Sequence, residues 1–210
     1  MLITKIKIIF IMTLFFSCST EQEEVTSVVL NTPAETSCNP ESENGFLGYV
    51  KVGEVGIVKV GEPISNFKDN TAYEVQEVEQ IVQDGEGNMF TRKVSHLFYN
   101  MNEVMLLEME REATTTIKSI TTSSKYFYLE NCIHVSSSLE ELKTKFPKLS
   151  AELNFDDSML YLYNESDPSI TFMFTPDNIL ESKLINEIDG RVSIENINPE
   201  ALIISIKVKN

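Results

Sequence analysis

The sequence has no tryptophan, only two histidines and three cysteines among its 210 residues, and it is short of positive charge. Its 17 basic side chains stand against 32 acidic ones, which gives a formal net charge of −15 at pH 7. Because a negative surface repels the phosphates of DNA and RNA, this composition argues against nucleic-acid binding. Core-forming residues are not scarce: hydrophobic residues make up 42% of the chain, enough for a packed domain.

The short motifs of catalytic and nucleotide-binding sites are also missing. The sequence contains no GxSxG, HExxH or GxxxxGKS/T pattern, and Gly85 and Gly87 lack the third glycine of a dinucleotide-binding loop. His96 and His134 lie in alternating apolar segments, which favours outward-facing strand residues over general bases. We therefore predict that the protein is not an enzyme and has no catalytic, cofactor-binding or metal-binding residues.

Two groups of acidic residues are the remaining candidates for chemistry. Asp84, Glu86 and Asn88 alternate as in a calcium-binding loop, but the bidentate glutamate that such a loop requires is missing, which favours a hairpin tip. Asp156 and Asp157 form a carboxylate pair, for which we favour a turn between a helix and the next strand. A hydrolase whose site is assembled from scattered carboxylates stays open as an alternative function.

The N-terminal segment has the layout of an export signal. Lys5 and Lys7 precede an apolar run over residues 8–16, which only Thr13 interrupts. A basic start followed by a short apolar core is typical of a signal peptide, whereas a transmembrane helix needs about 20 apolar residues. We predict a signal peptide over residues 1–17. Its removal takes away Lys5 and Lys7 and changes the formal net charge from −15 to −17.

The end of this segment, Phe15-Phe16-Ser17-Cys18, resembles the lipobox of Gram-negative lipoproteins that are processed by signal peptidase II. Ser17 and Cys18 fit the pattern, while Phe15 and Phe16 depart from it. The resemblance implies that Cys18 is the first residue of the mature chain and carries the lipid. Two or more acyl chains, such as palmitate, anchor a protein stably because each buried methylene contributes about 0.8 kcal/mol. We therefore expect a lipoprotein of the outer membrane, with the membrane as its partner through Cys18.

A polar, acidic stretch follows the expected lipid site. We interpret residues 18–45 as a flexible tether, and we expect folded structure from Phe46 onward. Glu21, Glu23 and Glu24 resemble the acidic signal that some Gram-negative lineages use to display lipoproteins on the cell surface. An ordinary solvated tether explains the same residues.

The other two cysteines suggest a covalent link. An exported protein meets an oxidising compartment, so Cys38 and Cys132 are candidates for a disulfide. Two unpaired thiols are the alternative, because spacing alone does not determine connectivity. No CxxC motif is present to indicate a metal site.

The body contains an internal similarity at an offset of 75 residues. "IVKVGEPISNF" at 57–67 aligns with "CIHVSSSLEEL" at 132–142, and "HLFY" at 96–99 aligns with "TFMF" at 171–174. Each copy has a short strand and a turn, followed by an amphipathic helix and alternating strands. Ser138 and Glu141 form a capping box at the start of the second helix, and Pro147 ends it. We predict an α+β fold of two similar helix-plus-meander units, 46–131 and 132–210.

This pattern resembles the helix-plus-meander units of exported lipoproteins of the SmpA/BamE type and of β-lactamase inhibitory proteins, which also open with a turn such as Val58–Gly61. The resemblance implies an outer-membrane assembly or inhibitor module. Our leading hypothesis is a lipid-anchored, non-enzymatic protein of the cell envelope. It would bind a protein or envelope partner through a face of its sheet.

Overall fold

The computed structural model describes residues 39–68, 72–83, 87–110, 115–181 and 189–210. Residues 37–210 form one compact unit. Within the described ranges, no helix has the length and apolar character needed to cross a bilayer.

Short strands dominate the described chain. Its first part contains a 3₁₀ helix and three short strands, then a helix and four longer strands: η1 (Pro40–Ser42), β1 (Gly48–Lys51), β2 (Glu54–Val55), β3 (Val58–Lys59), α1 (Ser65–Lys68), β4 (Glu74–Gln83), β5 (Met89–Tyr99), β6 (Asn102–Met109) and β7 (Ile117–Thr122). The second part follows in the order β8 (Phe127–Tyr128), α2 (Leu139–Lys145), β9 (Leu149–Asn154), β10 (Met159–Asn164), β11 (Asp167–Phe174), η2 (Pro176–Asn178), β12 (Arg191–Val192), η4 (Ile194–Asn196) and β13 (Ser205–Val208).

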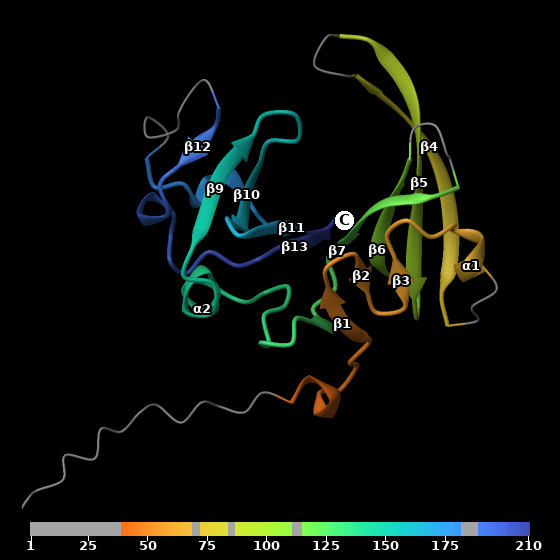
Figure 1. Ribbon diagram of the computed structural model, residues 1–210, viewed down its shortest axis with the longest axis horizontal. Coiled ribbons are helices and arrows are strands. Elements are labelled where there is room, and N and C mark those ends of the chain that lie inside the picture. The colour runs from red at the N-terminus through yellow and green to blue at the C-terminus, as the bar shows by residue number, and fades with distance from the viewer. Residues whose placement is uncertain (1–38, 69–71, 84–86, 111–114, 182–188) are drawn as a thin grey trace, which may run out of the picture. The chain divides into compact units, whose positions relative to one another are not determined.

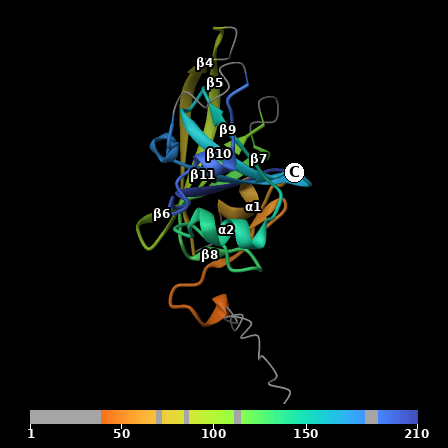
Figure 2. The same cartoon turned by 90° about the vertical axis from the view of Figure 1, so that its left-hand side faces the viewer.

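A nine-stranded antiparallel sheet joins both parts of the chain. Its strand order is β12-β9-β10-β11-β13-β7-β6-β5-β4. The joining strand is β13, which pairs with β11 on one side and with β7 on the other. Figures 1 and 2 both show β4 and β5 extending together beyond the neighbouring strands. The pairing agrees, because β5 is paired with β4 as far as Met89 but with β6 only from Val94 onward.

One continuous row of side chains crosses all nine strands of this sheet. Its members are direct cross-strand partners, all apolar except one, and we call them the buried row: Val192, Ala151, Leu162, Phe172, Ile206, Thr122, Met105, Leu97 and Val75. Thr122 is accommodated because its hydroxyl donates a hydrogen bond to the carbonyl oxygen of Val104 at 2.8 Å. The register therefore places one apolar stripe on a single face of the sheet.

Both helices and a second, four-stranded sheet cover that face. The small sheet has the order β3-β2-β1-β8. Val55 and Val58 of this sheet, Phe67 of α1, and Leu139 and Leu142 of α2 share one buried hydrophobic cluster with the buried row. Apolar burial of this kind contributes about 25 cal/mol per Å² removed from water, so this layer is the main source of stability.

The capping box predicted for the second helix is confirmed in α2. The Ser138 hydroxyl accepts a hydrogen bond from the Glu141 amide at 3.2 Å, and the Glu141 carboxylate accepts one from the Ser138 amide at 2.7 Å. Lys143 and Lys145 lie in the last turn, where their charges complement the helix dipole. These local interactions explain a seven-residue helix, whereas α1 has four residues.

The predicted α+β fold of two similar helix-plus-meander units is wrong. The described chain is mostly β-sheet, with two short helices, and the strands of its two parts form one sheet. The offset of 75 residues also fails as an alignment of equivalent strands. It superposes 96–99 of β5, the second strand after α1, on 171–174 of β11, the third strand after α2. The offset therefore matched strands with different neighbours.

Candidate functional site

The face opposite the buried row carries mostly polar side chains. Directly beside the buried row runs a second continuous set of cross-strand partners, which we call the open row: Ser150, Tyr163, Thr171, Lys207, Thr121, Leu106, His96 and Gln76. Seven of these eight residues are polar, and most are half-buried. Because successive side chains of a strand point to opposite faces, the open row and the buried row lie on different sides of the sheet. We call the side of the open row the open face.

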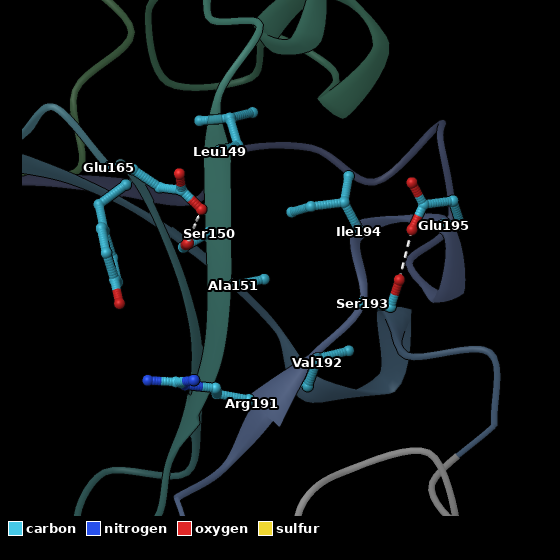
Figure 3. Close-up of a pocket in the computed structure, with 10 residues that line it drawn as sticks. Leu149, Ser150, Ala151, Glu165, Arg191, Val192, Ser193, Ile194 and Glu195 are labelled. Atoms are coloured by element: carbon cyan, nitrogen blue, oxygen red, sulfur yellow. Dashed lines mark hydrogen bonds between the residues drawn. The ribbon is translucent and has the colours of Figure 1, made fainter.

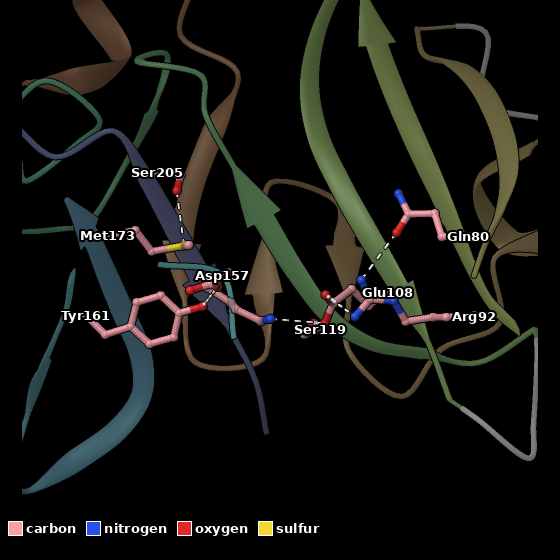
Figure 4. Close-up of polar contacts among 9 residues, drawn as sticks. Gln80, Arg92, Glu108, Ser119, Asp157, Tyr161, Met173 and Ser205 are labelled. Carbon is pink, nitrogen blue, oxygen red and sulfur yellow. Dashed lines mark hydrogen bonds and ion pairs between the residues drawn. The ribbon is translucent and has the colours of Figure 1, made fainter. Parts of the chain in front are cut away.

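A charged cluster lies at the centre of the open face. The Glu108 carboxylate accepts hydrogen bonds from Arg92 Nη1 at 3.0 Å, from Ser119 Oγ at 2.7 Å and from Lys207 Nζ at 3.0 Å. Arg92 Nη2 also donates to Gln80 Oε1 at 3.3 Å. The cluster draws on strands β4, β5, β6, β7 and β13, and so connects the two parts of the chain. Figure 4 shows Arg92, Glu108 and Gln80 on one part of the sheet, with Tyr161 and Met173 on the other.

The centre of this cluster is largely buried. The side chains of Glu108 and Lys207 are 15% and 16% exposed. Burial alone would raise the pKa of Glu108, but the charge of Lys207, the Ser119 hydroxyl and the charge of Arg92 outweigh it and lower that pKa. A carboxylate that is already ionised and holds three donors is a weak proton acceptor. The arrangement suits a fixed recognition surface better than general base catalysis.

A tyrosine on β10 brings a second polar contact to the same face. The Tyr161 hydroxyl donates a hydrogen bond to the Asp157 carboxylate (Figure 4). Burial, this hydrogen bond and the charge of Asp157 raise the pKa of Tyr161 well above its ordinary value, so the phenol stays neutral. Asp157 therefore has a structural partner, and Asp156 lies beside it in the turn between β9 and β10. The predicted turn is confirmed, although β9 and not the helix precedes it.

A pocket of about 450 Å³ lies at the β9–β12 end of the sheet (Figure 3). Its polar groups are largely engaged with one another. Ser150 Oγ donates to Glu165 at 2.8 Å, and the Ser193 hydroxyl donates to Glu195. The hydrogen bond from Ser193 lowers the pKa of Glu195. The pocket is also lined by Leu149, Ala151, Tyr163, Arg191, Val192 and Ile194. Because its carboxylates are paired within the protein, this pocket shows no arrangement for acid–base chemistry.

The two histidines lie in different surroundings. His96 belongs to the open row, and its Nδ1 lies 3.0 Å from Glu103 Oε1. His134 lies outside the strands, with its ring centroid 4.6 Å from that of Tyr128. Both side chains are half-buried, so the prediction that they face outward was only partly correct. The ring of His134 donates from Nδ1 to the carbonyl oxygen of Val135 at 2.5 Å. Ser137 Oγ accepts a hydrogen bond from the backbone amide of His134 at 3.3 Å, and not from its ring.

Several predicted site residues lie outside the described ranges. These are the lipidation residue Cys18, Cys38 of the candidate disulfide, and Asp84 and Glu86 of the loop. Cys132 is described and is disulfide-bonded, with φ of +73°. Its pairing with Cys38 stays a prediction. Of the aromatic run 126–128, Phe127 is buried, Tyr128 is half-buried and Tyr126 is exposed.

No metal site is evident where the structure is described: no group of three or more histidine, cysteine or acidic side chains is arranged to hold an ion. The Glu108 cluster was not predicted from the sequence, because Glu108 and Lys207 lie 99 residues apart. A local signal existed in each strand. Glu108 and Lys207 each interrupt an apolar run, at 104–109 and 201–208. Two opposite charges in apolar strands are candidates for mutual pairing.

Comparison with solved structures finds a similar fold. The crystal structure of the uncharacterized protein YfeY from Escherichia coli matches with a TM-score of 0.53 and 11% sequence identity, over 78% of this chain and 99% of that chain. At this identity the likeness concerns the fold alone. No protein-family model and no curated protein matches the sequence.

Proposed function

We propose that this chain is a lipid-anchored protein of the bacterial outer membrane, which binds a protein or envelope partner through the open face of its sheet. The observation that carries the proposal is the open row itself. Eight strands present a continuous, mostly polar set of side chains, and Lys207 of this row belongs to the charged cluster around Glu108. Pre-organised polar groups around a few apolar ones, here Leu106 and the Tyr163 ring, are the usual composition of a transient protein interface.

The anchor is tested by metabolic labelling with an alkyne analogue of palmitate. The wild type should incorporate the label, and Cys18→Ala should not. Cys38→Ala is the matched control, because it removes a cysteine of the same N-terminal region and should keep the label. Equal labelling of Cys18→Ala and the wild type would contradict the proposed lipid anchor at Cys18.

The binding face is tested by crosslinking in intact envelopes, with recovered partners compared between variants. Leu106→Arg with Tyr163→Arg places two bulky charges in the open row and should abolish the specific crosslinks. Phe155→Arg with Leu202→Arg is the control, because both side chains are more than half exposed. Unchanged crosslinks in the open-row variant would locate the interface elsewhere.

The alternative of a carboxylate-dependent hydrolase has its own test. A binding protein should keep its partner when His96, His134, Asp156 and Asp157 are neutralised one at a time. A hydrolase should lose turnover in at least one of these variants. Because Asp157 holds Tyr161, its variant should be checked for folding by circular dichroism.

A further inference from the structure

The outermost strand β4 forms one end of the nine-stranded sheet. All ten residues Glu74–Gln83 pair with β5 in register, without a bulge. Among the described strands, β5 is the only partner of β4. In an antiparallel pair, alternate residues of an edge strand direct their N–H and C=O groups away from the partner. The outer side of β4 therefore presents a long row of backbone donors and acceptors.

This edge lacks most of the devices that block strand addition. Natural edges are shortened, bulged, or interrupted by proline or lysine. The other end of the sheet follows this rule, since β12 has two residues. In contrast, β4 reads EVQEVEQIVQ, with no proline, glycine or lysine, and its Val78 and Ile81 are 43% and 73% exposed. The edge is long, free of bulges and partly apolar, which suits it to accept an added strand.

The charge of this edge identifies the kind of strand that fits. Glu77, Glu79 and Ile81 lie on one face of β4 by alternation. Lys68 contacts Glu77 at 2.6 Å, and Lys93 lies 3.9 Å from Glu79, but both carboxylates remain at least half exposed. A second copy paired antiparallel about Val78 would set Glu77 opposite Glu79, and like charges in that position are destabilising. The chain as a whole, at −15, also repels itself.

We propose that β4 is a binding site for an extended basic segment of a partner protein, which adds to the sheet as a further strand. Backbone hydrogen bonds along β4 hold the segment. Its lysine or arginine side chains at alternate positions contact Glu77 and Glu79, and the apolar side chains between them lie on the other face of the strand, beside Val78. This site is the outer backbone edge of β4 with Glu77 and Glu79, which lie on the opposite face of the strand from Gln76 of the open row. It does not depend on the lipid anchor.

The test uses the full chain in detergent and three short capped peptides. The first alternates lysine and valine, the second carries N-methyl groups on alternate amides, and the third has glutamate in place of lysine. The first should bind and slow hydrogen exchange in residues 74–83. The other two should bind about tenfold more weakly or worse, since one loses ladder hydrogen bonds and the other loses charge pairing. Absence of binding by the first peptide, or equal binding by the N-methylated one, overturns the proposal.

A matched pair of variants separates a local site from long-range attraction. Glu77→Lys with Glu79→Lys should weaken binding of the lysine–valine peptide about tenfold or more. Glu140→Lys with Glu200→Lys makes the same change in net charge at exposed positions of α2 and the 198–201 turn, and should have little effect. Equal losses in both variants overturn the proposal. Slower exchange in β4 as the protein alone is concentrated, together with a dimer mass in sedimentation, would assign the edge to a second copy and also overturn it.

Discussion

The buried row and the open row are neighbours on the same strands, yet they differ in composition and purpose. The buried row has eight apolar residues among nine, all joined in the core, whereas the open row has seven polar residues among eight. The first removes apolar area from water and so stabilises the fold. The second keeps half-buried polar groups at fixed positions, which contributes less to folding but leaves a surface for a partner. On each shared strand, the residue of the buried row and the residue of the open row are neighbours in the sequence.

Matched leucines give the largest expected contrast between the rows. Leu162 is fully buried in the buried row, and Leu106 is half-buried in the open row. Leu162→Ala should lower the free energy of unfolding by about 2–5 kcal/mol, because it leaves a cavity in the core. Leu106→Ala should cost about 1 kcal/mol or less, since water can fill the space. Urea denaturation measures both values. Similar losses would show that the open face is also a packed core.

The second prediction concerns pH and the charged cluster. The pKa of Glu108 is lower in the folded protein than its ordinary value of 4.5. Its ionised form therefore contributes stability above that value, and the contribution is lost as the pH falls through the folded pKa. In urea denaturation between pH 3 and 7, Glu108→Gln should show a smaller loss of stability on acidification than the wild type.

At neutral pH, Glu108→Gln should lower the free energy of unfolding by about 1–3 kcal/mol, because Lys207 and Arg92 lose a charged acceptor. Glu108→Gln combined with Lys207→Met should be less destabilising than the sum of the two single variants, since the lysine is no longer left without its carboxylate. Parallel pH profiles for Glu108→Gln and the wild type would contradict this account of the cluster.

A third prediction concerns helix α2, which packs over the buried row. Ser138→Ala removes the hydroxyl that caps α2 and should cost about 1 kcal/mol. Ser166→Ala, in the exposed turn between β10 and β11, is the control and should be near neutral. Thermal or urea denaturation detects the difference. Equal effects of the two substitutions would mean that the capping box does not stabilise α2.

The smallest effect should come from the turns that lead into the two helices. Gly61 has φ of +87° and Ser136 has φ of +80°, a conformation that glycine adopts without strain. The Gly61 amide donates to the carbonyl of Ile117 in β7, and the Ser136 amide donates to the carbonyl of Ile203, just before β13. Ser136→Gly should therefore raise the free energy of unfolding by about 0.5–1 kcal/mol. A decrease would show that the serine side chain has a stabilising role.

Local patterns in the sequence predicted local structure well. Apolar and polar residues alternate over most of β4, and Asn100 and Met101, both with positive φ, form the turn between β5 and β6. The capping box of α2 is confirmed. The strand β9 was missed, because only Ala151 among its six residues is fully buried and the pattern of alternation is weak.

These local patterns do not predict which distant strands pair with each other. Periodicity shows which residues of a strand share a face, but it does not identify the neighbouring strand. For this reason the junction between β7 and β13, and with it the meeting of Glu108 and Lys207, could not be predicted. The prediction of two separate units followed from the same limit. The candidate site was thus predicted as a face of a sheet, but without its central residues.

The place of β13 in the chain has a consequence for how the protein forms. In the direction of synthesis, this strand comes after every other strand of the large sheet. Until it is inserted, β7 and β11 each expose an unsatisfied edge, and the nascent molecule is vulnerable to self-association. Closing the sheet requires contacts between remote segments, which makes folding slow. A chaperone that shields these edges until β13 is inserted would suit such a late-closing architecture.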